Sequence, residues 1–177
     1  VYNVKTKEAR FTGQVSVTDK NYHTVSKDMG FNTETKATRF YGASTVVGDS
    51  GRTRIQTSLG YYDSQKGIAS LTSHSQIWYD GEYIEGDTLF YNRQTGYGYG
   101  IGSVIAWDTA NHSTLYCEKT EYSRRKRIFI ASGKPVIQQI KGEDTLYLRA
   151  DTFYSAPIFK NVKGRDSVGP KLASLRP

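Results

Sequence analysis

The chain has 177 residues, enough for one domain with its own core, and a net charge of +7 with a pI of about 9.4. Aromatic residues make up 13 %, with 14 tyrosines against one methionine, and such a composition favours strands over helices. The mean hydropathy is −0.59 and no apolar run approaches the roughly 18 residues of a membrane helix, which argues against a helical membrane protein.

The positive charge favours an anionic partner, such as nucleic acid, anionic lipid or a phosphorylated glycan, although solubility alone would explain it equally well. The single cysteine, Cys117, cannot form an intramolecular disulfide, so cysteine usage does not indicate the compartment. The chain begins at Val1 and lacks a signal-peptide pattern. We expect that a targeting segment has been removed from view.

Two markers repeat along the chain in step. An aromatic residue followed by a polar turn recurs at intervals of 29 to 32 residues, at Tyr2, Phe31, Tyr62, Tyr91, Tyr122 and Tyr154. A small residue recurs at intervals of 29 to 31, at Gly13, Gly42, Ser73, Gly102 and Gly133. A repeat of this length is typical of a stacked architecture whose units cannot bury their apolar faces alone.

Each unit is expected to contain a polar turn, a strand, a second turn and a return strand. The forward strands are predicted at 9–18, 38–47, 68–79, 97–107 and 128–140, and the return strands at 22–31, 53–62, 83–91, 113–122 and 145–154. Residues between them are rich in Asp, Asn and Gly, which tolerate turn dihedrals. No segment keeps a 3.6-residue period, so helix content is expected to be near zero.

Alternation in the forward strands places the small residue on the apolar face. Ala9, Phe11, Gly13, Val15 and Val17 share one face of the first strand. A glycine within a strand usually marks a bend or bulge, so a row of them predicts an elongated antiparallel sheet folded over along its length, with an apolar crease. About ten or more strands are expected in residues 1–154, followed by a tail or incomplete repeat at 155–177.

A family resemblance is carried by the fourth unit. Ile84-Glu85-Gly86-Asp87-Thr88-Leu89-Phe90-Tyr91-Asn92-Arg93-Gln94-Thr95-Gly96, followed by Gly102-Ser103-Val104-Ile105-Ala106-Trp107-Asp108, resembles the OstA/LptA-like family of lipopolysaccharide transport proteins. Weaker copies lie at 31–36 with Gly42, and at 151–154. The chain departs from the family pattern in the fifth unit, where Pro135 follows Gly133 and Gln139 replaces the turn aspartate, which puts the pairing of that unit in doubt.

The resemblance implies a folded-over antiparallel β-jellyroll, or β-taco, whose apolar groove holds the acyl chains of lipopolysaccharide. It further implies a periplasmic, non-enzymatic protein without a cofactor, which pairs end to end with itself or with other OstA-like domains in a transport bridge. Candidate groove residues are the apolar side chains of the inner face, each of which would serve equally as plain core: Phe11, Val15, Val17, Phe40, Val46, Leu71, Ile77, Leu89, Ile105, Leu115, Phe129, Ile137 and Leu146.

The densest cationic cluster is Arg124-Arg125-Lys126-Arg127, which is either a solvated turn or a contact for lipid A phosphates. The alternating glycines Gly96, Gly98, Gly100 and Gly102 indicate either a tight crease or space for a ligand chain. No nucleic-acid partner is expected, because the charge comes without a recognised binding motif, although exposed tyrosines could stack on bases.

Catalytic and metal sites are not expected. Gly48-Asp49-Ser50-Gly51 resembles the loop around a serine nucleophile but falls at a turn of the repeat, and the three histidines lack metal-ligand spacing. Asp80, Glu82, Glu85 and Asp87 gather at one hairpin, which a solvated turn explains. The alternatives are a carbohydrate-active β-solenoid enzyme, for which these carboxylates would be the acids, and a structural module that pairs by its sheet edges.

Overall fold

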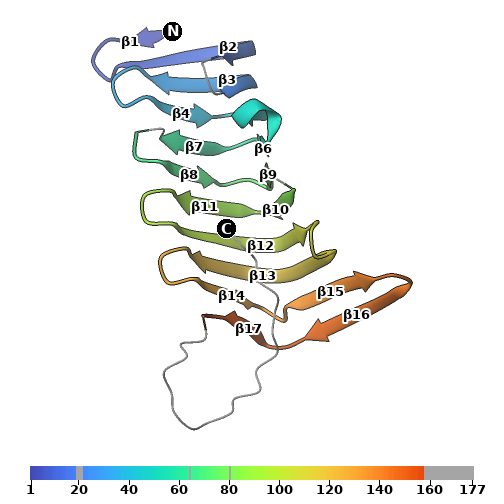
Figure 1. Cartoon of the computed structure of the whole chain (residues 1–177). Coiled ribbons are helices and arrows are strands. Elements are labelled where there is room, and N and C mark those ends of the chain that lie inside the picture. The colour runs from blue at the N-terminus through green and yellow to red at the C-terminus, as the bar shows by residue number, and fades with distance from the viewer. Residues whose placement is uncertain (19–21, 64, 80, 158–177) are drawn as a thin grey trace.

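The computed structural model describes residues 1–18, 22–63, 65–79 and 81–157, which form a single antiparallel sheet of 17 strands (Figure 1). The only helical element among them is the three-residue turn η1 (Asp49–Gly51). The all-β, antiparallel class predicted from composition and alternation is therefore confirmed. The expected tail at 155–177 lies almost wholly outside the described residues.

Each pass of the chain across the sheet has two halves with different strand partners. Four passes run unbroken: β2 (Glu8–Thr18), β3 (Tyr22–Asn32), β12 (Tyr97–Asp108) and β13 (Ser113–Ser123). The other passes are interrupted in the middle and form pairs of short strands: β4 (Ala37–Phe40) with β5 (Ser44–Gly48), β6 (Thr53–Thr57) with β7 (Gly60–Asp63), β8 (Ile68–Leu71) with β9 (Ser75–Tyr79), β10 (Glu82–Gly86) with β11 (Thr88–Asn92), β14 (Ile128–Ser132) with β15 (Val136–Lys141), and β16 (Asp144–Arg149) with β17 (Thr152–Ser155).

The halves form two ladders, which we call limb A and limb B. Limb A runs from β1 (Tyr2–Asn3) through the first half of β2, the second half of β3, β4, β7, β8, β11, the first half of β12, the second half of β13 and β14 to β17. Limb B contains the remaining halves together with β5, β6, β9, β10, β15 and β16. The line where the limbs meet is the crease.

The crease is produced by one extra residue in each forward pass. In β2 the residues Gly13 and Gln14 lie opposite the single residue Lys27 of β3, and in β12 Gly102 and Ser103 lie opposite Glu118. Gly13, Gly102 and Gly133 have φ of +99°, +76° and +80°, a conformation that glycine adopts without steric cost. These are β-bulges, and they bend the sheet at the small residue of the repeat.

Pro135 does not disturb the fifth unit. It is buried in the break between β14 and β15, where its ring displaces no ladder hydrogen bond, and its carbonyl accepts a hydrogen bond from the backbone N–H of Ala150 at 3.4 Å. β14 pairs with both β13 and β17, and β15 with both β13 and β16. The expected disruption of pairing in this unit was therefore wrong, because a proline at a break lacks only a donor that the break does not use.

The polar turns that join the strands of limb A are built alike. The residue after each marker aromatic accepts hydrogen bonds from the backbone N–H groups two and three positions on, as Asn3, Asn32, Asp63 and Asn92 do at 2.8–3.2 Å. Four positions after this acceptor residue, the chain takes a left-handed conformation, at Lys7, Lys36, Gly67, Gly96 and Arg127. The side chain that follows the aromatic thus fixes each turn.

Asp63 should make stability depend on acid pH. Its carboxylate accepts the backbone N–H of Lys66 at 2.8 Å, and this bond in particular lowers the pKa of Asp63 below its ordinary value. A lowered pKa contributes stability above the unfolded-state pKa, of about 3.9, and that contribution is lost as pH falls through the folded-state value. The thermal unfolding temperature of Asp63→Asn should therefore fall less on acidification than that of the wild type, since the asparagine side chain keeps an oxygen that accepts the same hydrogen bonds. Glu143→Gln, in an exposed turn, is the control, and identical acid profiles for Asp63→Asn and wild type would contradict the assignment.

Candidate functional site

The inner faces of the two limbs pack against each other along the crease. On limb A the column next to the crease contains Phe11, Met29, Phe40, Gly60, Leu71, Leu89, Gly100, Thr120, Ala131 and Phe153. On limb B it contains Val15, Ser26, Ser44, Thr57, Ser75, Gly86, Val104 and Cys117. A methyl group placed on Gly86 would lie 3.2 Å from Leu89 and 3.4 Å from Val104, so the two columns are in contact.

One step further from the crease, an aromatic wall faces an aliphatic wall. The limb A column holds Tyr2, Ala9, Phe31, Thr38, Tyr62, Ala69, Tyr91, Gly98, Tyr122 and Phe129. The limb B column holds Val17, Thr24, Val46, Ile55, Ile77, Ile84, Ala106, Leu115, Ile137 and Leu148. Side chains of both walls join one core cluster around Val104, Leu115, Cys117 and Ala131. The interior is therefore apolar in the C-terminal half of the stack, whereas buried hydroxyl groups enter it in the N-terminal half.

Four hydroxyl groups line the crease of limb B in its N-terminal half. Ser26 and Ser44 are 2.7 Å apart, and Ser75 donates to Thr57 at 2.8 Å. Each hydroxyl oxygen also lies within hydrogen-bond distance of a backbone carbonyl two residues away in the bend, as Ser44 Oγ does at 2.7 Å from the Gly42 carbonyl. The hydroxyls satisfy carbonyl groups that the bend removes from the ladder, so their role is structural.

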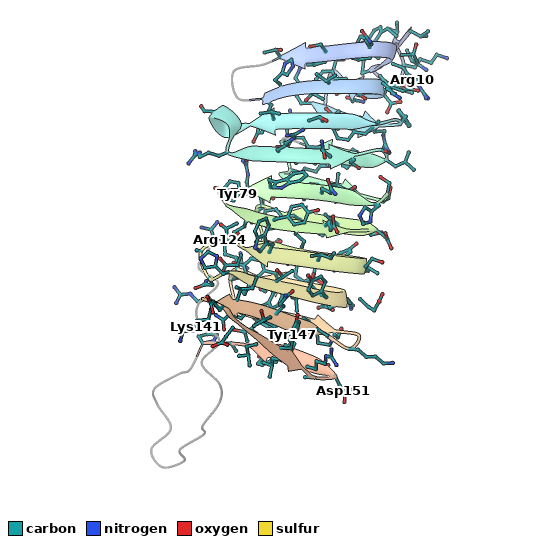
Figure 2. The ribbon with its side chains drawn as sticks, turned by 90° about the vertical axis from the view of Figure 1, so that its right-hand side faces the viewer. Arg10, Tyr79, Arg124, Lys141, Tyr147 and Asp151 are labelled. Atoms are coloured by element: carbon teal, nitrogen blue, oxygen red, sulfur yellow. The ribbon has the colours of Figure 1, made fainter. Side chains whose placement is uncertain are left out.

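The side of the interior away from the crease, which we call the mouth, carries tyrosines from both limbs. Tyr22 of limb B and Tyr62 of limb A meet edge to face with ring centroids 6.4 Å apart. Tyr91 and Tyr79 are 36 % and 49 % exposed, and desolvation raises the pKa of Tyr122 above its ordinary value. Figure 2 shows Tyr79 and Arg124 on one side of the stack and Arg10 and Asp151 toward the other.

Most of the predicted groove residues lie on the inner face, and one does not. Phe11, Val15, Val17, Phe40, Val46, Leu71, Ile77, Leu89, Leu115, Phe129 and Ile137 belong to the four columns, and Leu146 pairs with Gln139 two positions beyond Ile137. Ile105 is the correction. It stands between Val104 and Ala106, which face the interior, so alternation directs Ile105 to the outer face, where it pairs with Glu85 and Tyr116.

The predicted residues differ greatly in exposure. Phe40, Leu71 and Leu89 are 5 %, 2 % and 4 % exposed, so protein atoms already fill the space around them. Phe11 and Val17 at the N-terminal end, and Leu146 at the C-terminal end, are 44 %, 42 % and 64 % exposed although they face inward. The interior is therefore closed at the crease in the middle of the stack and accessible at its two ends.

Arg124, Arg125, Lys126 and Arg127 form the exposed turn between β13 and β14 on limb A. In Figure 2 Arg124 lies on the same side of the stack as Tyr79. All four side chains of the cluster are exposed to solvent.

No protein-family model matches this chain, and no curated protein matches it in sequence. The described residues also contain no helix long and apolar enough to cross a membrane. The site is therefore interpreted from its own residues.

A second cluster, around His74, was not expected from the sequence, which showed an isolated histidine. On the outer side of limb B, His74 Nδ1 lies 3.0 Å from Asp87 Oδ1, and Nε2 lies 3.8 Å from Glu85 Oε2. Glu85 also accepts hydrogen bonds from Tyr83 and from Gln76. Of the hairpin carboxylates, Glu85 and Asp87 thus meet at His74, whereas Glu82 points to the opposite face of β10 and Asp80 lies outside the described residues.

The other sites considered for chemistry have structural roles. Ser50 lies in η1 with φ of +58°, within a turn. Cys117 is buried in the core cluster, and burial raises its pKa to about 11, so the thiol is protonated at neutral pH and acts as an apolar group. In the described part of the chain, no three His, Cys, Asp or Glu side chains are placed to hold a metal ion.

The aromatic markers are among the interior residues that the predicted groove positions did not include, as are the buried Met29 and Val104. Tyr2, Phe31, Tyr62, Tyr91 and Tyr122 form the aromatic wall, whereas the predicted positions were only residues of forward strands and aliphatic return residues. Their 29- to 31-residue spacing was the available signal. The last marker, Tyr154, is 60 % exposed and pairs with Ile130 on the outer face, so it does not extend the wall.

Proposed function

We propose that this chain is an LptA-like domain, a folded-over β-jellyroll of the β-taco type, that binds the acyl chains of lipopolysaccharide between its limbs. In this function the domain is non-enzymatic, needs no cofactor, and carries the glycolipid through the periplasm toward the outer membrane. The observation that supports it most is the apolar interior, with its aromatic wall on limb A and its aliphatic wall on limb B.

The energetic basis is the burial of hydrocarbon. Each acyl CH₂ removed from water contributes about 0.8 kcal/mol, so a few chain segments in contact with the walls would hold a lipid without covalent chemistry. The accessible wall residues are those near the mouth and the ends, such as Tyr91, Phe11 and Val17. The crease residues, in contrast, hold the limbs together. A bound acyl chain would therefore lie nearer the mouth than the crease.

Charge at the mouth supports the same ligand. Arg124, Arg125, Lys126 and Arg127 are exposed, with Arg124 on the same side of the stack as Tyr79, where the phosphates of a glycolipid with buried acyl chains would emerge. Guanidinium groups bind phosphate through paired, charge-assisted hydrogen bonds. The proposed ligand thus matches an apolar interior and a cationic border.

The ends of the stack are suited to end-to-end association. β16 pairs with β15 alone among the described strands, and all its residues are exposed. At the other end, the second half of β2 pairs only with β3. Unpaired edges with exposed Phe11, Val17 and Leu146 would allow a second copy, or another domain of the same kind, to continue both the ladder and the apolar interior. A purely structural module would use the same edges.

Photo-crosslinking at adjacent residues of opposite faces tests the lipid site. A crosslinking amino acid at Tyr91 or Ile77, on the walls, should label bound lipopolysaccharide, whereas one at Phe90 or Gln76, their outward neighbours, should not. These positions are better probes than the buried Phe40 and Leu71, where a new side chain would disturb the packing. Labelling is read on gels with an antibody to lipopolysaccharide. Equal labelling of both faces, or none at Tyr91 and Ile77, would reject the proposed interior site.

The alternative is a carbohydrate-active enzyme, and the His74 cluster is the feature that favours it. A histidine held between two carboxylates on an accessible face is a possible acid–base group. The cluster also has a structural role. The backbone N–H of Asp87 donates to the carbonyl of Gly102 at 2.9 Å and so helps to fix the bend there. Polysaccharide turnover that Asp87→Asn abolishes would favour the enzyme over the transport function.

A further inference from the structure

The turns at the edge of limb A form a row of cations that extends well beyond the cluster in the fifth unit. In Figure 1 the hairpin turns β1–β2, β3–β4, β7–β8, β11–β12 and β13–β14 follow one another along the same edge. The first turn carries Lys5 and Lys7, the next three carry Lys36, Lys66 and Arg93, and the fifth carries residues 124–127. All these side chains are exposed. The row is a property of the assembled sheet, because its members are about 30 residues apart in sequence.

The spacing of the row follows from the sheet. Successive turns are separated by two strands, hence by about 9.6 Å, and the five turns extend over roughly 38 Å. Neighbouring turns are also bonded to each other: Thr33 N–H donates to Lys7, Arg93 N–H to Gly67 and Arg124 N–H to Gly96, at 2.8–2.9 Å. The cations are thus presented on a rigid backbone at a regular interval.

Two glycines bring the arginines close to the preceding turns. A methyl group on Gly67 would lie 3.0 Å from Cβ of Arg93, and one on Gly96 would lie 2.7 Å from Cβ of Arg124. Each arginine therefore lies directly over the turn before it. The side chains are aligned along the edge of the limb as the turns stack.

The described turns of the opposite edge carry less positive charge. Their residues, at 49–52, 81, 109–112 and 142–143, include one arginine and no lysine, and Lys141 ends β15 beside the last of them. On the cationic edge, Glu34 is the one acidic residue within the described turn tips, at 4–7, 33–36, 65–67, 93–96 and 124–127. Asp63, at the base of the third turn, is 1 % exposed, accepts hydrogen bonds from the turn, and lies 3.7 Å from Nζ of Lys66. Among the described turn residues, the excess of positive charge is therefore concentrated on one edge.

We infer that this row is a binding site for a linear anionic polysaccharide, whose carboxylate or phosphate groups are held by the successive turns. The residues between the cations are Thr6, Thr35, Gln65, Gln94 and Thr95, which offer hydroxyl and amide groups suited to sugar hydroxyls.

The tips carry no aromatic side chain on which a nucleic-acid base could stack. Val4 is the only apolar side chain among them, which leaves little to insert into a membrane. The site needs no acyl chain, although its fifth turn, residues 124–127, is the cluster that the proposed function assigns to glycolipid phosphates.

The test compares two variants of equal charge. The row variant combines Lys5→Gln, Lys66→Gln, Arg93→Gln and Arg125→Gln, none of which lies at a positive φ. The control combines Lys27→Gln, Lys119→Gln, Lys141→Gln and Arg149→Gln, which lie at the crease, on the opposite edge and in β16. Binding to polygalacturonate chains is measured by titration calorimetry, with neutral dextran as the uncharged polymer and circular dichroism as the check of folding.

The wild type should bind polygalacturonate but not dextran, and its affinity should fall steeply with salt. The affinity of the row variant should be lower than that of the wild type by about tenfold or more. The affinity of the control should stay within about threefold of wild type, because each exposed charge by itself has a modest effect. Affinity should also rise with chain length until the polymer spans the row. Equal losses in the two variants would show that only net charge matters and would overturn the site. Binding to vesicles containing phosphatidylglycerol, without binding to polygalacturonate, would overturn it in favour of a membrane surface.

Discussion

Leu71→Ala is expected to lower the free energy of unfolding by about 2 to 5 kcal/mol, because it leaves a cavity where the two limbs meet. Leu71 is 2 % exposed at the crease end of β8, and it pairs with Gly60 on one side and Leu89 on the other. A methyl group on Gly60 would lie 2.8 Å from Cδ2 of Leu71, so the leucine already occupies the space that the glycine leaves. The neighbouring backbone cannot move to refill that space without shifting the ladder.

The measurement is chemical denaturation followed by tyrosine and tryptophan fluorescence. Leu59→Ala is the matched control, since Leu59 lies at the same bend but is 46 % exposed, and its loss should cost less than about 1 kcal/mol. Because each unit of a stack contacts only its neighbours, Leu71→Ala should also weaken β7, β8 and β11 more than the two ends. Similar costs for Leu71→Ala and Leu59→Ala would contradict the packing described for the crease.

Gly133→Ala is expected to destabilise the fold by about 2 to 5 kcal/mol, from two causes that add. Gly133 has φ of +80°, and a residue with Cβ loses about 1 to 2 kcal/mol in the left-handed region. The new methyl group would also lie 2.4 Å from Cβ of Glu118 and 3.3 Å from its backbone nitrogen, and overpacking of this kind costs about 1 to 3 kcal/mol. Since the obstructing atoms belong to or adjoin the backbone of β13, a change of rotamer cannot relieve the clash.

Gly13→Ala separates the two causes. Gly13 occupies the same position in the first unit with φ of +99°, but no atom lies within 4 Å of the site of a new methyl group. It should therefore cost only the backbone term, about 1 to 2 kcal/mol. Both variants are compared by denaturant midpoint and by thermal unfolding. If Gly133→Ala is no worse than Gly13→Ala, the contact between β14 and β13 at the bend is looser than described.

The repeat predicted the strands well because its two markers report on backbone requirements. The expected strand at 9–18 is β2, and the expected strand at 38–47 is β4 and β5 with Gly42 in the break between them. Gly13, Gly102 and Gly133 lie in the bulges, where a positive φ is needed, so a local property of glycine determined the bend positions. The sequence thereby indicated where the chain turns and where each strand bends.

Alternation was less reliable for faces, because the two kinds of pass cross the crease differently. In forward passes four positions separate the two crease columns, as between Phe11 and Val15, so the inward parity is the same before and after the crease. In return passes three positions separate them, as between Ser26 and Met29, so the inward parity changes in the middle of the pass. The parity of a return strand therefore depends on the bulge in its partner, which its own residues do not reveal.

By itself the sequence determined the all-β class, the period of about 30 residues, the turn chemistry and the apolar face of the forward strands except at Ile105, because each follows from local backbone preference and strand alternation. Only the tertiary structure decided that the markers Phe31, Tyr62, Tyr91 and Tyr122 form one wall, that His74 meets Asp87 and Glu85, and that the cationic turns align in a row. These groupings join residues from different passes. Their distances are set by strand register and by the two-strand pitch of the sheet, which the pairing of the passes fixes and a single segment does not contain.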